Sequence, residues 1–350
     1  MDSAYSPLKP VFHVDQLETL RAGRYPVPVH VQLVLSDLCN QDCSFCAYRM
    51  SGGLSTELFG TAATHNPNRK MPFEKAMEIV EDCARLGVKA IQFTGGGEPT
   101  VHPKHLEVMR FAQVLGMQTG LVTNGVKMDP AHPSIRAMTW VRVSVDAGTA
   151  ESYAHIRGVS AAMWGRVWGN VKALSAGYEG KLGVGFVVTP ANYHELAACA
   201  RMCEASGVQN MRIGAVFSEM GDGYYGDLVP AIHEAIAKAK AVVSTLEVID
   251  LFDRRMKDLD DGRPTDEFCG YQHFNAYIGA DLNVYRCCNT AYTTRGTVAS
   301  LKNQRLAEFF DNPATGYKGF DARNCTACQF NAQNKAIASL LTAPEHVNFV

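Results

Sequence analysis

With 350 residues, the chain is long enough to bury a substantial core and suggests roughly two domains, although α/β barrels reach this length as one. Its composition, with 47% hydrophobic and 19% charged residues, 30 glycines and 15 prolines, excludes collagen-like and disordered chains. Lys and Arg total 33 and Asp and Glu total 35, so the net charge of −2 gives no overall basic field, and a nucleic-acid partner is not expected.

The first ten residues, MDSAYSPLKP, have the pattern of neither a signal peptide nor a membrane anchor. No apolar run reaches the ~18 residues that a membrane-spanning helix needs. We therefore expect a soluble, cytoplasmic protein without a membrane partner.

Further along the chain, short β-branched runs bounded by Gly, Asn or Asp predict buried strands. These runs cover residues 30–36, 90–95, 118–124, 140–148, 181–189 and 210–216. Helical patterns lie between them, and the repeated order of helix, glycine and strand predicts a parallel sheet with right-handed crossovers. Six strands are too few for a closed eight-stranded barrel, so we predict an α/β fold, a partial (β/α)6 barrel.

A different pattern begins after the sixth strand. An amphipathic helix is predicted over residues 227–247, and from about residue 250 the βα rhythm stops. Residues 273–288, HFNAYIGADLNVYRCC, predict a hairpin. We therefore divide the chain into an N-terminal extension over 1–28, the barrel over 29–249 and a small C-terminal α+β domain over 250–350.

Two loops are candidate lids over a site. Residues 51–70, between the first two strands, are rich in Gly, Ser, Thr and Asn. Residues 221–226, GDGYYG, follow the sixth strand. Long loops of this kind often close over active sites.

The eleven cysteines are the most informative residues, because an odd number in a long chain without a signal peptide argues for metal or redox chemistry in a reducing compartment. Cys39, Cys43 and Cys46 follow the first strand directly. Three thiolates on one tight loop can hold three irons of a [4Fe–4S] cluster and leave the fourth iron open to a bidentate ligand. The alternatives are a zinc knuckle, which needs a fourth ligand, and thiols of the core.

The segment CNQDCSFCAYR, with Phe45 before the third cysteine, resembles the signature of the radical S-adenosylmethionine (radical SAM) superfamily. FTGGGEPT, at the end of the second predicted strand, is similar to the GGE motif of that family. The resemblance implies a partial TIM barrel, a [4Fe–4S] cluster on the three cysteines, and S-adenosylmethionine bound to the open iron through its amino and carboxylate groups.

The resemblance also implies cofactor contacts at the carboxyl ends of the strands. Gly95, Gly96 and Gly97 would let the backbone approach the methionine moiety, since glycine has no Cβ, and Glu98 would lie near the amino group. Weaker matches assign further cofactor contacts to Thr123, Asn124, Ser144, Asp146 and Arg157. For each of these residues, a surface cap or a turn is the alternative.

The C-terminal cysteines resemble those of the twitch subdomain, a shortened SPASM extension that carries one auxiliary [4Fe–4S] cluster. The resemblance implies four ligands, Cys269, Cys287, Cys325 and Cys328, with Cys287 preferred to Cys288 because it comes first after the hairpin strand. A structural zinc site fits this ligand count equally well. The spare thiols are interpreted as small buried hydrophobes.

A radical SAM enzyme would take one electron from an external reductant, such as a flavodoxin or a ferredoxin, and cleave S-adenosylmethionine to methionine and a 5′-deoxyadenosyl radical. This radical would abstract hydrogen from the substrate, giving oxidation or rearrangement. Because only residues 1–28 precede the barrel, we expect no N-terminal peptide-recognition module, which favours a small-molecule or nucleotide-like substrate. The alternatives are a peptide-modifying maturase, an iron–sulfur electron-transfer protein and a zinc-stabilised nucleic-acid-binding module.

Overall fold

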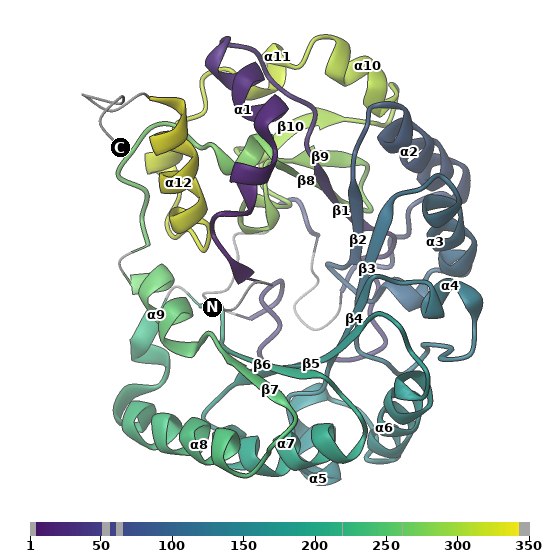
Figure 1. The fold of residues 1–350 in the computed structure, drawn as a ribbon, viewed down its shortest axis with the longest axis vertical. Helices are drawn as coiled ribbons and strands as arrows, with labels where there is room; N and C mark the ends of the chain where they lie inside the picture. The colour runs from purple at the N-terminus through teal and green to yellow at the C-terminus, as the bar shows by residue number, and fades with distance from the viewer. Residues whose placement is uncertain (1–4, 51–56, 61–65, 219, 261, 343–350) are drawn as a thin grey trace.

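The computed structural model describes residues 5–50, 57–60, 66–218, 220–260 and 262–342 (Figure 1). The strands are β1 (His30–Val34), β2 (Ala90–Thr94), β3 (Gln118–Thr123), β4 (Trp140–Ser144), β5 (Lys181–Val188), β6 (Asn210–Ala215), β7 (Glu247–Asp250), β8 (Asn275–Ile278), β9 (Asn283–Tyr285) and β10 (Thr297–Ser300). The helices are α1 (Val14–Arg21), α2 (Phe73–Arg85), α3 (His105–Val114), α4 (Pro133–Arg136), α5 (Ala150–Arg157), α6 (Ala162–Ser175), α7 (Leu196–Ala205), α8 (Val229–Ala241), α9 (Phe252–Asp260), α10 (Leu306–Asp311), α11 (Ala314–Tyr317) and α12 (Asn331–Leu341).

The ten strands of the described residues belong to one sheet, in the order β10-β9-β8-β1-β2-β3-β4-β5-β6-β7. Strands β1 to β7 run parallel to their neighbours, and the helices α2 to α8 cover the convex face of the curved sheet (Figure 1). Since β10 forms one edge and β7 the other, the barrel is open. The prediction of a partial α/β barrel is confirmed, and each of the six predicted strands is present as β1 to β6.

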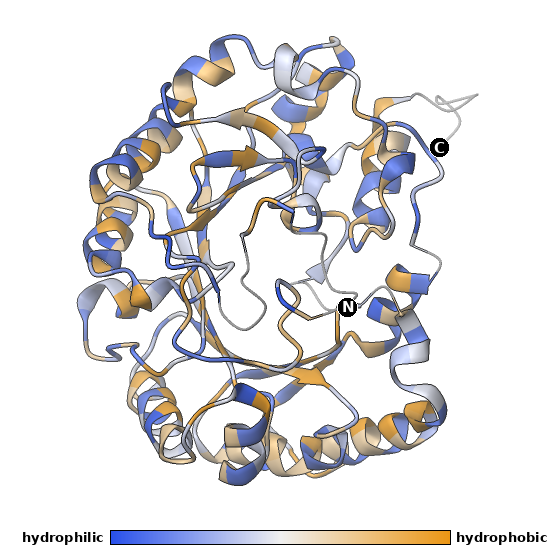
Figure 2. Ribbon diagram, turned by 180° about the vertical axis from the view of Figure 1, so that it is seen from behind, coloured by the Kyte–Doolittle hydropathy of each residue, from blue (hydrophilic) through white to orange (hydrophobic). Residues whose placement is uncertain are grey.

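The amphipathic pattern of the outer helices explains how they pack. In α2, Ala76, Ile79, Val80 and Cys83 recur at helical spacing and are fully buried. Figure 2 shows apolar and polar residues on different faces of these helices. The glycines predicted to end helices do so: Gly87 after α2 has φ 84°, a conformation that costs glycine little.

The prediction was incomplete after β6. The βα rhythm continues for one more unit, since the predicted helix over 227–247 ends at Ala241 and is followed by β7 and α9. The pattern missed β7 because it is a four-residue edge strand whose ends are exposed. No described helix is long and apolar enough to cross a membrane.

The C-terminal hairpin is present as predicted, with β8 antiparallel to β9. However, β8 also pairs in parallel with β1, with Asn275 opposite His30, so this region extends the sheet of the barrel. This pairing was not predicted, because nothing local in a four-residue strand specifies its neighbour.

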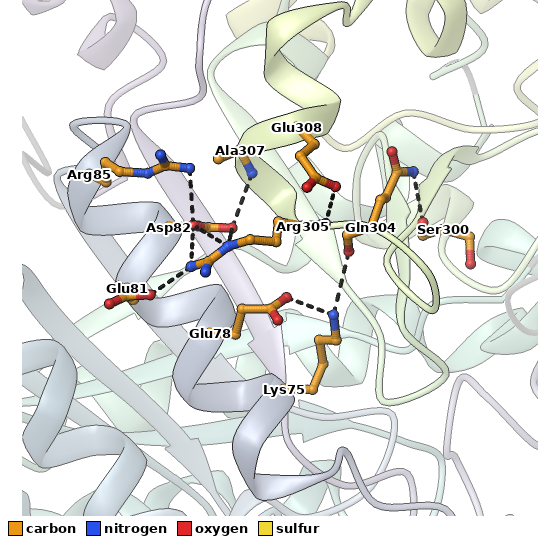
Figure 3. Close-up of polar contacts among 10 residues, drawn as sticks. All are labelled: Lys75, Glu78, Glu81, Asp82, Arg85, Ser300, Gln304, Arg305, Ala307 and Glu308. Atoms are coloured by element: carbon orange, nitrogen blue, oxygen red, sulfur yellow. Dashed lines mark hydrogen bonds and ion pairs between the residues drawn. The ribbon is translucent and has the colours of Figure 1, made fainter.

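A group of ion pairs also fastens the C-terminal region to the barrel (Figure 3). Asp82 of α2 is fully buried and accepts hydrogen bonds from Arg305 Nη2, at 2.7 Å, and from the backbone N–H of Ala307 on α10, at 3.1 Å. Arg305 also pairs with Glu81 at 2.6 Å. These contacts hold α10 against α2.

Of the two candidate lids, the loop over 51–70 lies partly outside the described residues, at 51–56 and 61–65. Its described part includes Phe59, which is fully buried. The loop over 221–226 forms short 3₁₀ turns, and Tyr225, which joins them, is buried. Closure of either loop over a site stays a prediction.

Candidate active site

The loop that carries the first three cysteines starts at the carboxyl end of β1 and is held by the end of α5. The backbone N–H of Asp42 donates to the carbonyl of Arg157 at 2.9 Å, and that of Ser44 to Ile156 at 3.0 Å. These bonds, both to the last turn of α5, fix the loop at the carboxyl edge of the sheet.

A cavity of about 390 Å³ opens beside this loop. Of the predicted site residues, it is lined by Cys39, Cys43, Phe45, Cys46, Gly95, Gly96, Gly97, Glu98, Thr123, Asn124, Ser144 and Arg157. Residues from five separate segments of the chain therefore meet in one space. Asp146, which was also predicted, is not among the lining residues.

The three glycines bring the end of β2 against the start of the cysteine loop. A Cβ on Gly97 would lie 2.3 Å from the carbonyl oxygens of Asp37 and Leu38, and one on Gly96 would lie 2.5 Å from a ring carbon of Phe59. Glycine is therefore required here by the protein's own packing. The expected approach of this backbone to a methionine moiety stays a prediction.

Glu98 ties the ends of β2 and β3 together. Its carboxylate is buried and accepts hydrogen bonds from Thr123 Oγ1 at 2.6 Å, Thr100 Oγ1 at 2.7 Å and the backbone N–H of Asn124 at 2.7 Å. This explains why Thr123 and Asn124 reach the same cavity. Burial, followed by the charge of Glu98, raises the pKa of Cys39 to about 12.

Arg157 holds the cysteine loop from the side of α5. It is 5% exposed, and its Nη1 donates to Cys43 Sγ and to Gln41 Oε1, each at 3.3 Å. Its guanidinium lies 5.7 Å from the ring centroid of Phe45. Burial raises the pKa of Cys43, and the adjacent Arg157 opposes that rise. Arg157 is thus placed to stabilise a thiolate.

Asp146 is the ion-pair partner of Arg157. The two side chains form a buried ion pair, and Asp146 Oδ1 accepts from the backbone N–H of Val187 at 2.6 Å. Asp146 has φ 60°, which is uncommon for a residue other than glycine. Asp146 orients Arg157 and joins the ends of β4 and β5, and its predicted contact with the cofactor stays a prediction.

Asp37 was missed by the sequence reasoning. It is fully buried and accepts hydrogen bonds from Arg69 Nε at 2.6 Å and from the hydroxyl of Tyr292 in the C-terminal region. Burial raises the pKa of Asp37 to about 6, against the pull of Arg69. A carboxylate between an apolar strand and a cysteine is the signal that could have identified it.

The four C-terminal cysteines predicted as a second set lie close together. Burial raises the pKa of Cys269 to about 12 and that of Cys325 to about 11, and the charge of Cys287 adds to both shifts. Burial also raises the pKa of Cys328, and the charges of Cys287, Cys269 and Cys325 raise it further. These four thiols therefore act on one another electrostatically.

Cys288 faces a different way from Cys287. It lines the 390 Å³ cavity, and its Sγ accepts from Gln329 Nε2 at 3.2 Å. The buried Arg286 lies close to the other set, where Cys269 and Cys287 act to raise its pKa against the larger effect of burial. Arg286 donates to Gln272 Oε1 at 2.6 Å and to the carbonyl of Gly316 at 2.7 Å, and among the described ion pairs none involves it, so a cationic side chain is buried near Cys269, Cys287 and Cys325.

These two arrangements fit the expected iron–sulfur groups. Among the described residues, no three His, Cys, Asp or Glu side chains lie close enough together to bind a single metal ion. A four-iron cluster does not require that closeness, because each thiolate binds a different iron atom. A cationic guanidinium beside each thiol set, Arg157 and Arg286, suits an anionic cluster.

Comparison with known protein families and sequences gives three findings. The model of the radical SAM superfamily matches residues 33–203. An S-adenosylmethionine-dependent nucleotide dehydratase of Flammeovirga pacifica is 32% identical over 133 residues, 37% of this chain and 42% of the relative. The mycofactocin maturase MftC of Mycobacterium tuberculosis (strain CDC 1551 / Oshkosh) is 27% identical over 214 residues, 60% of this chain and 50% of the relative.

Among solved structures, SuiB of Streptococcus suis bound to S-adenosylmethionine matches with a TM-score of 0.62 and 15% identity, over 90% of this chain and 74% of that chain. This likeness concerns the fold. The chain spans half or less of the length of the two sequence relatives, so their activities do not carry over with the match.

Proposed function

The chain belongs to the radical SAM superfamily, and on that premise we propose that it abstracts a hydrogen atom from a small-molecule or nucleotide-like substrate. Cys39, Cys43 and Cys46 would hold a [4Fe–4S] cluster, and S-adenosylmethionine would occupy the cavity beside them. The observation that carries this proposal is the single cavity that joins the three thiols to the ends of β2, β3 and β4.

When bound, the cluster and S-adenosylmethionine supply the reductive cleavage that yields methionine and a 5′-deoxyadenosyl radical. The chain's own residues orient the cofactor and keep water away from it. Glu98, Thr123, Asn124 and Ser144 line the space that the methionine and ribose parts would fill. Arg157 would hold the Cys43 thiolate, as its 3.3 Å contact with Sγ indicates.

We also propose an auxiliary [4Fe–4S] cluster on Cys269, Cys287, Cys325 and Cys328. Support comes from the mutual electrostatic effect of these thiols and from the nearby cationic Arg286. With all four positions supplied by protein, this cluster would relay electrons or stabilise the fold. The proposed electron source is an external reductant such as a flavodoxin or a ferredoxin. All eleven cysteines are unpaired, which suits the reducing cytoplasm.

A peptide substrate is the second candidate. It is favoured by the similarity to a protein named as a PqqA peptide cyclase, of Rhodopseudomonas palustris, which is 27% identical over 163 residues, 47% of this chain. The two candidates share the same cofactor chemistry and differ only in what enters the cavity.

The proposed function can be tested with protein purified without oxygen. We expect about eight irons per chain, two four-iron clusters, and 5′-deoxyadenosine when dithionite and S-adenosylmethionine are added. Replacing Cys39, Cys43 and Cys46 with Ala should abolish 5′-deoxyadenosine and leave about half the iron. Cys83→Ala, which removes a buried thiol of α2, is the matched control. It should keep both the iron content and the formation of 5′-deoxyadenosine of the wild type.

Either of two results would refute the assignment. One is zinc in place of iron in the wild-type protein. The other is undiminished 5′-deoxyadenosine formation by the triple variant.

A further inference from the structure

A second cavity, of about 1010 Å³, fills the interior of the open barrel. It adjoins the cavity of the cysteine loop, and the two share the lining residues Tyr48, Thr94, Arg212, Arg255, Cys288 and Gln329. A molecule in the larger space can therefore reach the site where the radical would form.

The charge of this barrel cavity is strongly unbalanced. Its lining includes seven Lys and Arg residues and two carboxylates, Glu247 and Asp258. Four of the cations are arginines, Arg142 on β4, Arg212 on β6, and Arg254 and Arg255 on α9. Among the ion pairs of the described residues, none involves these four arginines.

Aromatic rings contact Arg142, Arg212 and Arg255, and the carboxylate of Asp258 acts electrostatically on Arg255 and Arg254. Arg212 lies 5.6 Å from the ring centroid of Tyr5, and Arg142 Nη1 donates to the Tyr5 hydroxyl at 3.4 Å. Arg255 lies 5.7 Å from the ring centroid of Phe217. A cation–π contact orients a guanidinium but does not neutralise it.

Arg212 is the centre of the group. Its Nε is buried and has no hydrogen-bond partner. Burial, then the positive charge of Arg142, lowers the pKa of Arg212 to about 9, and Arg255 and Arg254 act in the same direction. These arginines are half-buried around one cavity, and an anion placed among them would offset their mutual repulsion.

There is also room for a ligand beside Arg212. Gly214, two residues further along β6 on the same face, lines the cavity of the cysteine loop. A Cβ added to Gly214 would meet nothing within 4 Å. Open space therefore runs from the arginines toward the cysteine loop, over roughly 7 Å of strand.

We infer that Arg142, Arg212 and Arg255 bind a phosphate group of the substrate, and that the substrate is a phosphorylated small molecule. This inference rests on the proposed function for the identity of the bound molecule as substrate. A phosphate suits the site better than a carboxylate, because it carries up to two charges and accepts bidentate hydrogen bonds from several guanidinium groups at once. The reacting carbon of the substrate would then extend toward Gly214.

The probe for this site is inorganic pyrophosphate, titrated calorimetrically into the iron-loaded, oxygen-free protein. We expect Arg212→Gln and Arg142→Gln each to weaken binding by about tenfold or more, which corresponds to loss of a charged hydrogen bond. Arg212→Lys keeps the positive charge but loses the planar guanidinium group, so its affinity for pyrophosphate should lie between those of Arg212→Gln and the wild type. Arg110→Gln, on the exposed face of α3, is the matched control and should bind as wild type.

Four outcomes decide the inference. Absence of pyrophosphate binding by wild-type protein, or equal binding by the Gln variants and wild type, overturns it. Binding of pentaglutamate in preference to pyrophosphate replaces the phosphorylated small molecule by an acidic peptide and also overturns it. Loss of pyrophosphate binding in Arg142→Gln and Arg212→Gln, with iron content and circular dichroism unchanged, supports it.

Failure here and failure of the proposed function are distinguishable. Pyrophosphate binding does not require S-adenosylmethionine cleavage. If 5′-deoxyadenosine forms but pyrophosphate does not bind, only the phosphate site is wrong; in the reverse case, the site stands and the radical chemistry does not.

Discussion

At the scale of single residues, the chemistry of the site depends on side chains that hold the thiols as well as on the thiols themselves. Arg157 contacts Cys43, Gln41 and Asp146 at once, and Asp146 in turn is held by the backbone of β5. Such supporting contacts fix a ligand's orientation and charge.

Replacing Arg157 should therefore weaken the first cluster. We expect Arg157→Gln to lose on the order of 10–100-fold in iron affinity at this site, since it removes the cation beside Cys43. Arg157→Lys should recover little, because a single ammonium cannot bridge Cys43, Gln41 and Asp146. Iron retained after a chelator challenge measures the effect, and equal retention in all three proteins would contradict it.

The adjacent Cys287 and Cys288 give a matched pair for the auxiliary site. Cys287→Ala should lower iron by about half, since it removes one of the four proposed ligands of the proposed auxiliary cluster. Cys288→Ala should retain wild-type iron, because this thiol lines the barrel cavities. Iron analysis and electron paramagnetic resonance distinguish them, and the opposite pattern would assign the ligand to Cys288.

At the scale of secondary-structure elements, the contact between α2 and α10 joins the C-terminal region to the barrel. Asp82 is fully buried on α2, and it accepts a hydrogen bond from Arg305, the residue that precedes α10 (Figure 3). A buried carboxylate without its partner is destabilising.

Arg305→Gln should accordingly lower the thermal midpoint by several degrees. Asp82→Asn should do the same, and the double variant should be little worse than either single change, because both remove one shared contact. Differential scanning calorimetry on the cluster-loaded protein measures the three variants. Strictly additive losses would show that the two side chains act independently.

At the scale of the whole molecule, the pH dependence of stability has a contribution from His273. This ring is 2% exposed, and burial, followed by the charge of Arg286, lowers its pKa to about 4. The unfolded chain binds a proton near pH 6.5. The contribution of His273 to the free energy of unfolding is therefore fully present above pH 6.5. It is lost as the pH falls from 6.5 toward 4, by up to about 3 kcal/mol.

His273→Phe keeps an aromatic ring against Tyr317 and removes this titration. The fall in unfolding free energy between pH 7 and pH 5 should be smaller in the variant than in the wild type. Denaturant titration at the two pH values measures both slopes. Parallel slopes would show that His273 does not contribute.

The sequence allowed prediction of whatever is encoded locally. Six strands have long apolar runs, and the cysteine loop and the glycines of the GGE motif each lie within a few residues. The pairing of β8 with β1 and the meeting of Arg142 with Arg212 depend on segments far apart in the chain. The buried role of Asp146 depends on Arg157, which local patterns do not show.

Because β8 pairs with β1, the C-terminal region is joined to the barrel by hydrogen bonds as well as by the peptide chain. The cysteine loop extends from one of these strands and the hairpin bearing Cys287 from the other, so neighbouring strands about 4.8 Å apart set the relative placement of both thiol groups. A peptide bond cut between α9 and β8 would leave the two pieces joined by this ladder and by α10 on α2. The relative placement of the two sets of thiols would then persist in the cleaved molecule.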